Sequence, residues 1–176
     1  MRHSDSAITV VIMGVSGAGK TTIGQSLALE LGAEFRDGDD LHSEENIAAM
    51  AAGTPLGDRE RTPWLHAVGR SLAEARSGSQ DVVMACSALK RSYRDLLRQH
   101  VPDLFFVFLD GPMDLVHERI VQRNHDFMPA SLLASQYLSL QPLQDDEDGI
   151  RIDIAEARDQ MVREIMATPE LATQGS

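Results

Sequence analysis

The apolar residues of this chain form two alternating patterns, short continuous runs and longer stretches with helical spacing. The continuous runs predict buried strands, at Ile8–Met13, Glu34–Arg36, Val82–Cys86, Leu104–Leu109 and Ile150–Ile154. Apolar residues three or four apart predict helices, at Lys20–Leu31, Glu44–Ala52, Arg61–Ala75, Lys90–Gln99, Met113–Gln122, Ala130–Leu140 and Ala155–Ala167. Strands that alternate with helices predict an α/β fold, in which a parallel sheet is covered by helices on both faces.

Length and composition are those of one ordinary globular domain. The chain has 176 residues, 43% of them apolar, so we expect a single domain over residues 1–176 with a frayed tail from about 168 to 176. No stretch approaches the roughly 20 apolar residues of a membrane span. The six N-terminal residues are polar and too few for a secretory signal, and the single cysteine, Cys86, excludes an internal disulfide. We therefore expect a cytoplasmic protein without membrane contacts.

The charge of the chain excludes one class of partner. The formal net charge is −11, whereas binding to a phosphate backbone needs a basic face, so nucleic acid is not an expected partner. The acidic stretch 144–149 is interpreted as a solvated loop. The cations are 14 arginines and only two lysines, Lys20 and Lys90. Because Lys90 follows a predicted buried strand, we expect it either to lie near a substrate or to fix its loop.

A glycine-rich segment links the first predicted strand to the first predicted helix. The segment, which fits the phosphate-loop pattern G-x-x-x-x-G-K-[ST], is Gly14-Val15-Ser16-Gly17-Ala18-Gly19-Lys20-Thr21. Its backbone N–H groups predict a concave anion site, to which Lys20 adds a mobile charge. The Thr21 hydroxyl is expected on Mg²⁺, and Ser16 and Thr22 are further donors. This segment therefore predicts binding of a nucleoside triphosphate with Mg²⁺.

The next predicted strand ends in acidic residues, Asp37-Gly38-Asp39-Asp40. Phosphorylation of an alcohol needs a group that positions the attacking hydroxyl, and it needs anionic support for Mg²⁺. We assign Asp39 to the hydroxyl and Asp37 to the magnesium water shell. The alternative is an acidic turn, because Asp and Gly favour turns. The third strand ends in Cys86 and Ser87 with no acid, so the magnesium carboxylate has to come from elsewhere.

Two arginines precede a segment that has the composition of a hinged loop. Arg119 and Arg123 lie four residues apart and therefore on one helix face. In small kinases a lid brings arginines over the γ-phosphate and excludes water. We therefore predict a mobile lid at about residues 123–135, with Arg119 and Arg123 on the nucleotide and Arg123 in catalysis. Ordinary salt bridges to Glu118 or Asp126 are the alternative.

A series of short segments carries a resemblance to a known family. The segments are Asp37-Gly38-Asp39-Asp40-Leu41-His42, Asn46-Ile47, Met50, Gly53-Thr54-Pro55-Leu56, Asp58-Arg59-Glu60-Arg61, Thr62-Pro63-Trp64-Leu65, Cys86-Ser87-Ala88-Leu89-Lys90 and Tyr93-Arg94-Asp95-Leu96-Leu97-Arg98. In order and spacing the chain resembles the gluconokinases, small phosphate-loop kinases related to shikimate kinase, from the first strand to about Gln141. The resemblance implies phosphoryl transfer from ATP to the 6-hydroxyl of D-gluconate, a five-stranded parallel sheet with a mobile lid, and a homodimer.

Gluconate carries a carboxylate, and planar bidentate binding of a carboxylate is typical of arginine. Arg61, in a segment that matches the family's substrate-side helix, is therefore assigned to the sugar acid, with His42 and Lys90 as further substrate contacts. The alternatives are that Arg61 pairs with acids on a solvated helix start and that His42 is structural. Trp64, the only tryptophan, is expected to pack beneath the site.

The chain departs from the family pattern at two places. The lid typically reads Gly-His-Phe, but this chain has His125-Asp126-Phe127, and Gln141 stands where the family tends to have an acid.

Two rival functions also stay open. One is a kinase of the same build for another polyhydroxy acid such as shikimate, and the other is a nucleotide-binding regulator without catalysis. Lys20, Thr21 and Asp39 oppose the regulator, because a mere binder needs no acceptor carboxylate.

Overall fold

A five-stranded parallel sheet forms the centre of the protein. The structure is a computed structural model, and it describes residues 6–123 and 130–172. Within these residues the strands pair in the order β2-β3-β1-β4-β5, all parallel. They are β1 (Thr9–Met13), β2 (Glu34–Asp37), β3 (Val82–Ala85), β4 (Phe105–Asp110) and β5 (Gly149–Asp153). The predicted α/β fold is confirmed, and every strand end lies within one residue of its predicted position.

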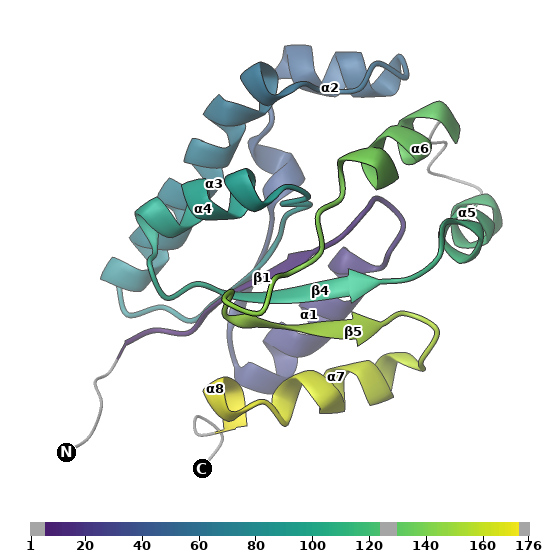
Figure 1. The fold of residues 1–176 in the computed structure, drawn as a ribbon. Coiled ribbons are helices and arrows are strands. Elements are labelled where there is room, and N and C mark those ends of the chain that lie inside the picture. Colours follow the sequence, from purple (N-terminus) through teal and green to yellow (C-terminus); the bar gives the residue numbers. More distant parts are fainter. Residues whose placement is uncertain (1–5, 124–129, 173–176) are drawn as a thin grey trace.

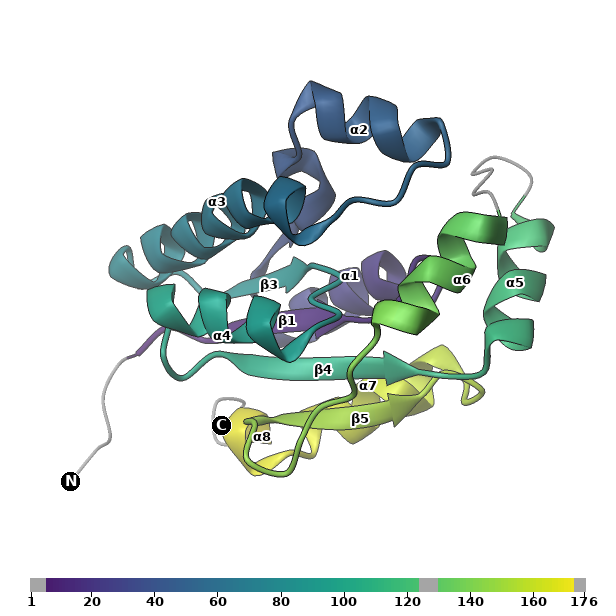
Figure 2. The same cartoon turned by 45° about the horizontal axis from the view of Figure 1, so that its top comes forward.

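Helices cover both faces of the sheet (Figure 1). Those described are α1 (Lys20–Leu31), α2 (Glu44–Ala51), α3 (Asp58–Ser77), α4 (Arg91–His100), α5 (Met113–Gln122), α6 (Ala130–Ser139), α7 (Arg158–Met166) and α8 (Pro169–Ala172), with a 3₁₀ turn η1 at Gly38–Leu41. α3 and α4 pack on one face, and α1 and α7 pack on the other. Figure 2 shows α5 and α6 beyond the carboxyl ends of β1 and β4, where ligands bind in sheets of this type.

The two faces of the sheet have separate apolar cores, and β1 contributes to both. Val10 and Ile12 pack on the side of α1 and α7, whereas Val11 and Met13 pack on the side of α3 and α4. All four side chains are fully buried. Burial on both faces explains why the strands are continuous apolar runs rather than alternating ones.

Two helix starts differ from prediction by more than one residue. α3 begins at Asp58 rather than Arg61, and Pro63 lies inside it. Asp58 and Glu60 in the first turn favour this start, because carboxylates stabilise the positive end of a helix. α7 begins at Arg158 rather than Ala155, because the Asp153 carboxylate accepts the backbone N–H of Ala155 and holds a turn there.

The expectation of a frayed tail from Thr168 is wrong for residues 168–172. Thr168 Oγ1 donates to the carbonyl of Ile165, and α8 places Leu171 in the core with 2% of its surface exposed. The last four residues lie outside the described part of the chain. No helix within residues 6–123 and 130–172 is long and apolar enough to cross a membrane.

Candidate active site

The phosphate loop joins β1 to α1 and has the backbone that its glycines allow. Gly17 and Gly19 have φ angles of +82° and +103°, a region that side chains with a Cβ rarely adopt. A Cβ at Gly17 would also come within 2.6 Å of Ile120. Lys20 Nζ donates to the carbonyl oxygens of Gly14 (3.0 Å) and Val15 (2.9 Å). Burial lowers the pKa of Lys20, and the charge of Asp39 opposes that shift.

Thr21 and Asp37 bring two oxygen ligands together at the start of α1. Thr21 Oγ1 donates to Asp37 Oδ2 at 3.4 Å, and Asp37 Oδ1 accepts the backbone N–H of Asp39 at 3.0 Å. Mg²⁺ prefers oxygen ligands and is usually held by one or two protein groups together with phosphates and water. This pair fits such an ion. In the described residues no three His, Cys, Asp or Glu side chains gather as a metal cage.

A cavity of about 250 Å³ lies beside the phosphate loop, and we call it the acceptor cavity. It is lined by residues of the loop, η1, the segment after β3, and the helices α2, α3 and α6. The lining residues are Ser16, Lys20, Asp39, His42, Met50, Ala51, Arg61, Ser87, Leu132 and Gln136. Four residues predicted for substrate binding or catalysis, Lys20, Asp39, His42 and Arg61, therefore meet in one place although they come from three separate elements.

Asp39 faces the cavity beside His42. Its side chain is 72% exposed, yet it stands in a concave site, and reduced hydration there raises its pKa while Lys20 opposes the rise. Asn46 Nδ2 lies 3.4 Å from His42 Nδ1. An amide nitrogen only donates, so Nδ1 accepts and the His42 proton lies on Nε2, 4.0 Å from Asp39 Oδ1. Burial lowers the pKa of His42 to about 4, so this ring is neutral at physiological pH.

Trp64 packs beneath the cavity, as its sequence context predicts. Only 2% of its surface is exposed, and its indole Nε1 donates to the carbonyl of Gly38 at 2.7 Å. Its ring stacks on His42 with 4.1 Å between centroids and 13° between planes. Trp64 thus fixes both η1, which carries Asp39, and the His42 ring. On the same helix, half-buried Arg61 donates from Nε to the carbonyl of Leu56 at 3.1 Å.

Lys90 lies outside the acceptor cavity. Its Nζ donates to Asp58 Oδ1 at 2.9 Å, and the Tyr93 hydroxyl donates to the same oxygen. The contact ties the loop after β3 to the first turn of α3. Lys90 also lies close to Arg61, since Lys90 Nζ and Arg61 Cζ are 5.6 and 5.8 Å from the centroid of the Tyr93 ring. The structure therefore provides the geometry for fixing the loop, and a substrate contact of Lys90 stays a prediction.

A second cavity, of about 450 Å³, lies on the other side of the phosphate loop. Arg119 and Arg123 both line it, together with Gly17, Gly19 and Thr22 of the loop and its helix. Arg119 Nη2 donates to the carbonyl of Ile154 at 2.5 Å, whereas Arg123, at the end of α5, is exposed. Both arginines therefore lie beside the phosphate loop, and their contact with the nucleotide stays a prediction. Of the predicted lid, at about residues 123–135, residues 124–129 with His125, Asp126 and Phe127 lie outside the described residues, and residues 130–135 belong to α6.

Arg94 of α4 and Glu147, which precedes β5, form an ion pair in which both side chains are fully buried. The bonds from Arg94 Nε and Nη2 to the carboxylate are 2.7 and 2.8 Å, and Arg98 Nη2 adds one of 2.7 Å. Burial alone would raise the pKa of Glu147, but hydrogen bonds from Arg94, the Gln144 backbone and Arg98 lower it to about 2. The expectation that residues 144–149 are a solvated loop is therefore wrong for Glu147.

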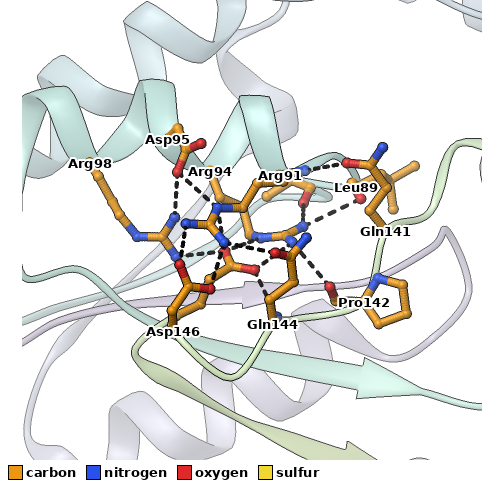
Figure 3. A network of polar contacts seen from close by, with 11 residues as sticks. Leu89, Arg91, Arg94, Asp95, Arg98, Gln141, Pro142, Gln144 and Asp146 are labelled. Atoms are coloured by element: carbon orange, nitrogen blue, oxygen red, sulfur yellow. Dashed lines mark hydrogen bonds and ion pairs between the residues drawn. The ribbon is translucent and has the colours of Figure 1, made fainter.

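The same arginine holds two chain segments that border the site (Figure 3). Arg94 donates to the carbonyls of Ala88 and Leu89 at 3.0 and 3.4 Å, and to that of Pro142 at 3.3 Å. Ala88 has a φ of +43°, which is uncommon for a residue with a Cβ. Gln141, where the family tends to have an acid, accepts the backbone N–H of Arg91 with Oε1 at 2.8 Å. The loop after β3 and the chain after α6 are thus joined to α4.

Sequence reasoning missed part of the cavity wall. Gln136, Leu132 and Ser87 line it, and none of them is among the predicted site residues. Gln136 contacts the phosphate loop directly, because its Oε1 accepts the backbone N–H of Ser16 at 2.7 Å. The one available signal was an amide side chain in a helix whose other polar residues are serines and a tyrosine.

Comparison with known proteins identifies the family. Residues 16–169 match the shikimate kinase family. The thermosensitive gluconokinase of Escherichia coli (strain K12) is 43% identical over 145 residues, which cover 82% of this chain and 78% of that protein. The solved structure of a gluconokinase from Sinorhizobium meliloti 1021 is 43% identical with a TM-score of 0.85, over 96% of this chain and 93% of that chain. The unliganded structure of a sugar kinase from Janibacter sp. HTCC2649 is 41% identical with a TM-score of 0.91, over 97% of this chain and 99% of that chain. The chain therefore belongs to the shikimate kinase family and, within it, to the gluconokinases.

Proposed function

We propose that this enzyme transfers the γ-phosphoryl group of ATP to the 6-hydroxyl of D-gluconate, giving 6-phospho-D-gluconate and ADP. The observation that carries the proposal is the acceptor cavity, which combines a carboxylate, a guanidinium and a neutral imidazole beside the phosphate-loop lysine. A sugar acid needs these groups, because its hydroxyls require hydrogen-bond partners and its carboxylate requires a cation. The gluconokinases at about 40% identity support the same acceptor.

In this mechanism Asp39 orients the attacking hydroxyl. A carboxylate accepts the hydroxyl proton as the new O–P bond forms and the bond from the γ-phosphorus to the ADP oxygen breaks. The raised pKa of Asp39 suits this role, since it brings the group nearer to the pH at which the enzyme works. His42, with its proton on Nε2, donates to a hydroxyl of the acceptor or to Asp39. Arg61 binds the gluconate carboxylate.

On the nucleotide side, the loop amides and Lys20 bind the phosphates. Lys20 Nζ exchanges its two carbonyl partners for phosphate oxygens, and loss of its charge from the transition state would cost several kcal/mol by analogy with oxyanion donors. Arg119 and Arg123 neutralise the charge that spreads over the transferred group. Mg²⁺ would be held by Thr21 and, through water, by Asp37, and when bound it neutralises phosphate charge.

The proposal includes an oligomeric state and a location in the cell. The family resemblance favours a homodimer, and the composition favours the cytoplasm. Light scattering coupled to gel filtration tests the first, since a monomer of 19.3 kDa and a dimer of twice that mass are well separated.

A coupled assay of ADP release over a panel of sugar acids tests the reaction. We expect turnover with D-gluconate to exceed turnover with shikimate and with other polyhydroxy acids by at least ~100-fold, because a site built for one set of hydroxyls leaves buried polar groups unpaired with another. Shikimate as the preferred acceptor would support the rival kinase. ATP binding without turnover on any acceptor would support the nucleotide-binding regulator.

A further inference from the structure

Gln136 links the phosphate loop to the acceptor cavity. It lies in α6, and its Oε1 accepts a hydrogen bond of 2.7 Å from the backbone N–H of Ser16, 120 residues away in sequence. Both residues line the acceptor cavity. The N–H groups of a phosphate loop are the donors that bind phosphate oxygens. The carboxamide oxygen of Gln136 therefore engages one N–H group of the loop whose donors bind phosphate.

The helix that carries Gln136 is tied to the rest of the fold on its C-terminal side. The Tyr137 hydroxyl donates to the carbonyl of Gly111 at 2.9 Å, and the backbone N–H of Gln141 donates to the carbonyl of Leu89 at 2.8 Å. Arg94 holds the next residue, Pro142, through its carbonyl (Figure 3). Because these contacts fix α6, the carboxamide can leave Ser16 by rotation about its own side-chain bonds, without movement of the helix.

A released carboxamide has a second set of partners within the same cavity. It carries one acceptor oxygen and two N–H donors, so it can bind a hydroxyl group in either direction. The cavity that Gln136 lines also contains Asp39 and Arg61. An acceptor that arrives before the nucleotide has to compete with Ser16 for this carboxamide, whereas an acceptor that arrives afterwards finds it free.

We propose that Gln136 couples the two substrates through this exchange. In the nucleotide-free enzyme it satisfies the Ser16 N–H, a phosphate of ATP then replaces it, and the released carboxamide binds a hydroxyl of the acceptor. The identity of the acceptor, D-gluconate, rests on the proposed function. Because coupling between two ligands is reciprocal, gluconate strengthens nucleotide binding by the same factor by which nucleotide strengthens gluconate binding.

Titration calorimetry with Mg²⁺ and ADP, without sugar, tests the exchange at Ser16. Gln136→Ala removes the competitor, so ADP binds about threefold to tenfold more tightly, which corresponds to one net hydrogen bond. Gln136→Glu keeps the acceptor oxygen and adds a negative charge that repels phosphate, so ADP binds more weakly than to the wild type. A purely structural role would weaken ADP binding in both variants and would overturn the proposal. Leu138→Ala, on the same helix and 89% exposed, is the matched control and leaves ADP affinity unchanged.

The coupling itself is measured by titration of D-gluconate with and without the β,γ-imido analogue of ATP. In the wild type the analogue lowers the Kd of gluconate. The ratio of the Kd without the analogue to the Kd with it falls about threefold to tenfold in Gln136→Ala, which again corresponds to one net hydrogen bond. Equal ratios in both proteins would overturn the coupling. If gluconate binds the wild type in neither state while the ADP results hold, the acceptor assignment fails and the exchange at Ser16 stands.

Discussion

Arg94 and Glu147 lie 53 residues apart in the sequence and form an ion pair in which both side chains are fully buried. The pair joins α4 to the chain between α6 and β5. Removal of one partner would leave an uncompensated buried charge, which typically costs about 3–5 kcal/mol. The pair also holds the two segments that border the acceptor cavity, so the stability of the fold and the shape of the site depend on the same contact.

This ion pair predicts a loss of stability in acid. Glu147 has a folded pKa of about 2 against an ordinary value of 4.5, so its contribution is complete above pH 4.5 and is lost as the pH falls towards 2. A shift of this size corresponds to roughly 3 kcal/mol. Urea unfolding at several pH values, followed by Trp64 fluorescence, measures how the free energy of unfolding depends on pH. Glu147→Gln should be less stable at pH 7 but should lose less stability between pH 4.5 and 3 than the wild type. Asp145→Asn, an exposed neighbour, should follow the wild type, and an unchanged pH dependence in Glu147→Gln would contradict the assignment.

Asp39→Asn should keep nucleotide affinity and lose most turnover, because it preserves the shape of the side chain and removes the proton acceptor. Contributions of general bases are typically ~10²–10⁴-fold in kcat. Asp40→Asn, at the exposed neighbouring position outside the acceptor cavity, is the control and should stay active. The raised pKa of Asp39 also predicts that the acid limb of kcat/KM lies above the ordinary aspartate value of 3.8. Near-normal kcat in Asp39→Asn would remove Asp39 from the mechanism.

Arg61→Ala should raise KM for gluconate about 10- to 100-fold and leave KM for ATP nearly unchanged, as expected for one lost charge-assisted hydrogen bond. Arg59→Ala is the matched control, since Arg59 is exposed on the same helix start and does not line the acceptor cavity. Arg61 also donates to the carbonyl of Leu56, so circular dichroism and urea unfolding should accompany the kinetics. An effect confined to the ATP parameters would move Arg61 to the nucleotide side.

The parts of this protein that were predictable from sequence are those encoded locally. Strands buried on both faces are continuous apolar runs, and the phosphate loop, Asp37 and Asp39 lie within short segments whose spacing fixes their geometry. The burial of Glu147 was not predictable in the same way, because it depends on Arg94 from a different helix. An acidic stretch cannot reveal which of its members meets a distant arginine. Gln136 was missed for the same reason, since its partner Ser16 is 120 residues away.

Replacement of Arg119 and replacement of Arg123 should have different effects on the kinetics. Arg123 lines the cavity beside the phosphate loop but is exposed at the end of α5, and we expect it to contact the γ-phosphate chiefly after the predicted lid has closed over ATP. Arg119 is already held beside the loop by the carbonyl of Ile154. Arg123→Ala should therefore lower kcat at least ~10-fold more than it weakens ATP binding to the free enzyme, because an interaction made chiefly in the transition state behaves in this way. Arg119→Ala should weaken ATP binding and kcat/KM together. Pre-steady-state kinetics combined with ATP-analogue titrations measure both quantities, and equal losses of affinity and kcat for Arg123→Ala would show that this arginine binds the ground state instead.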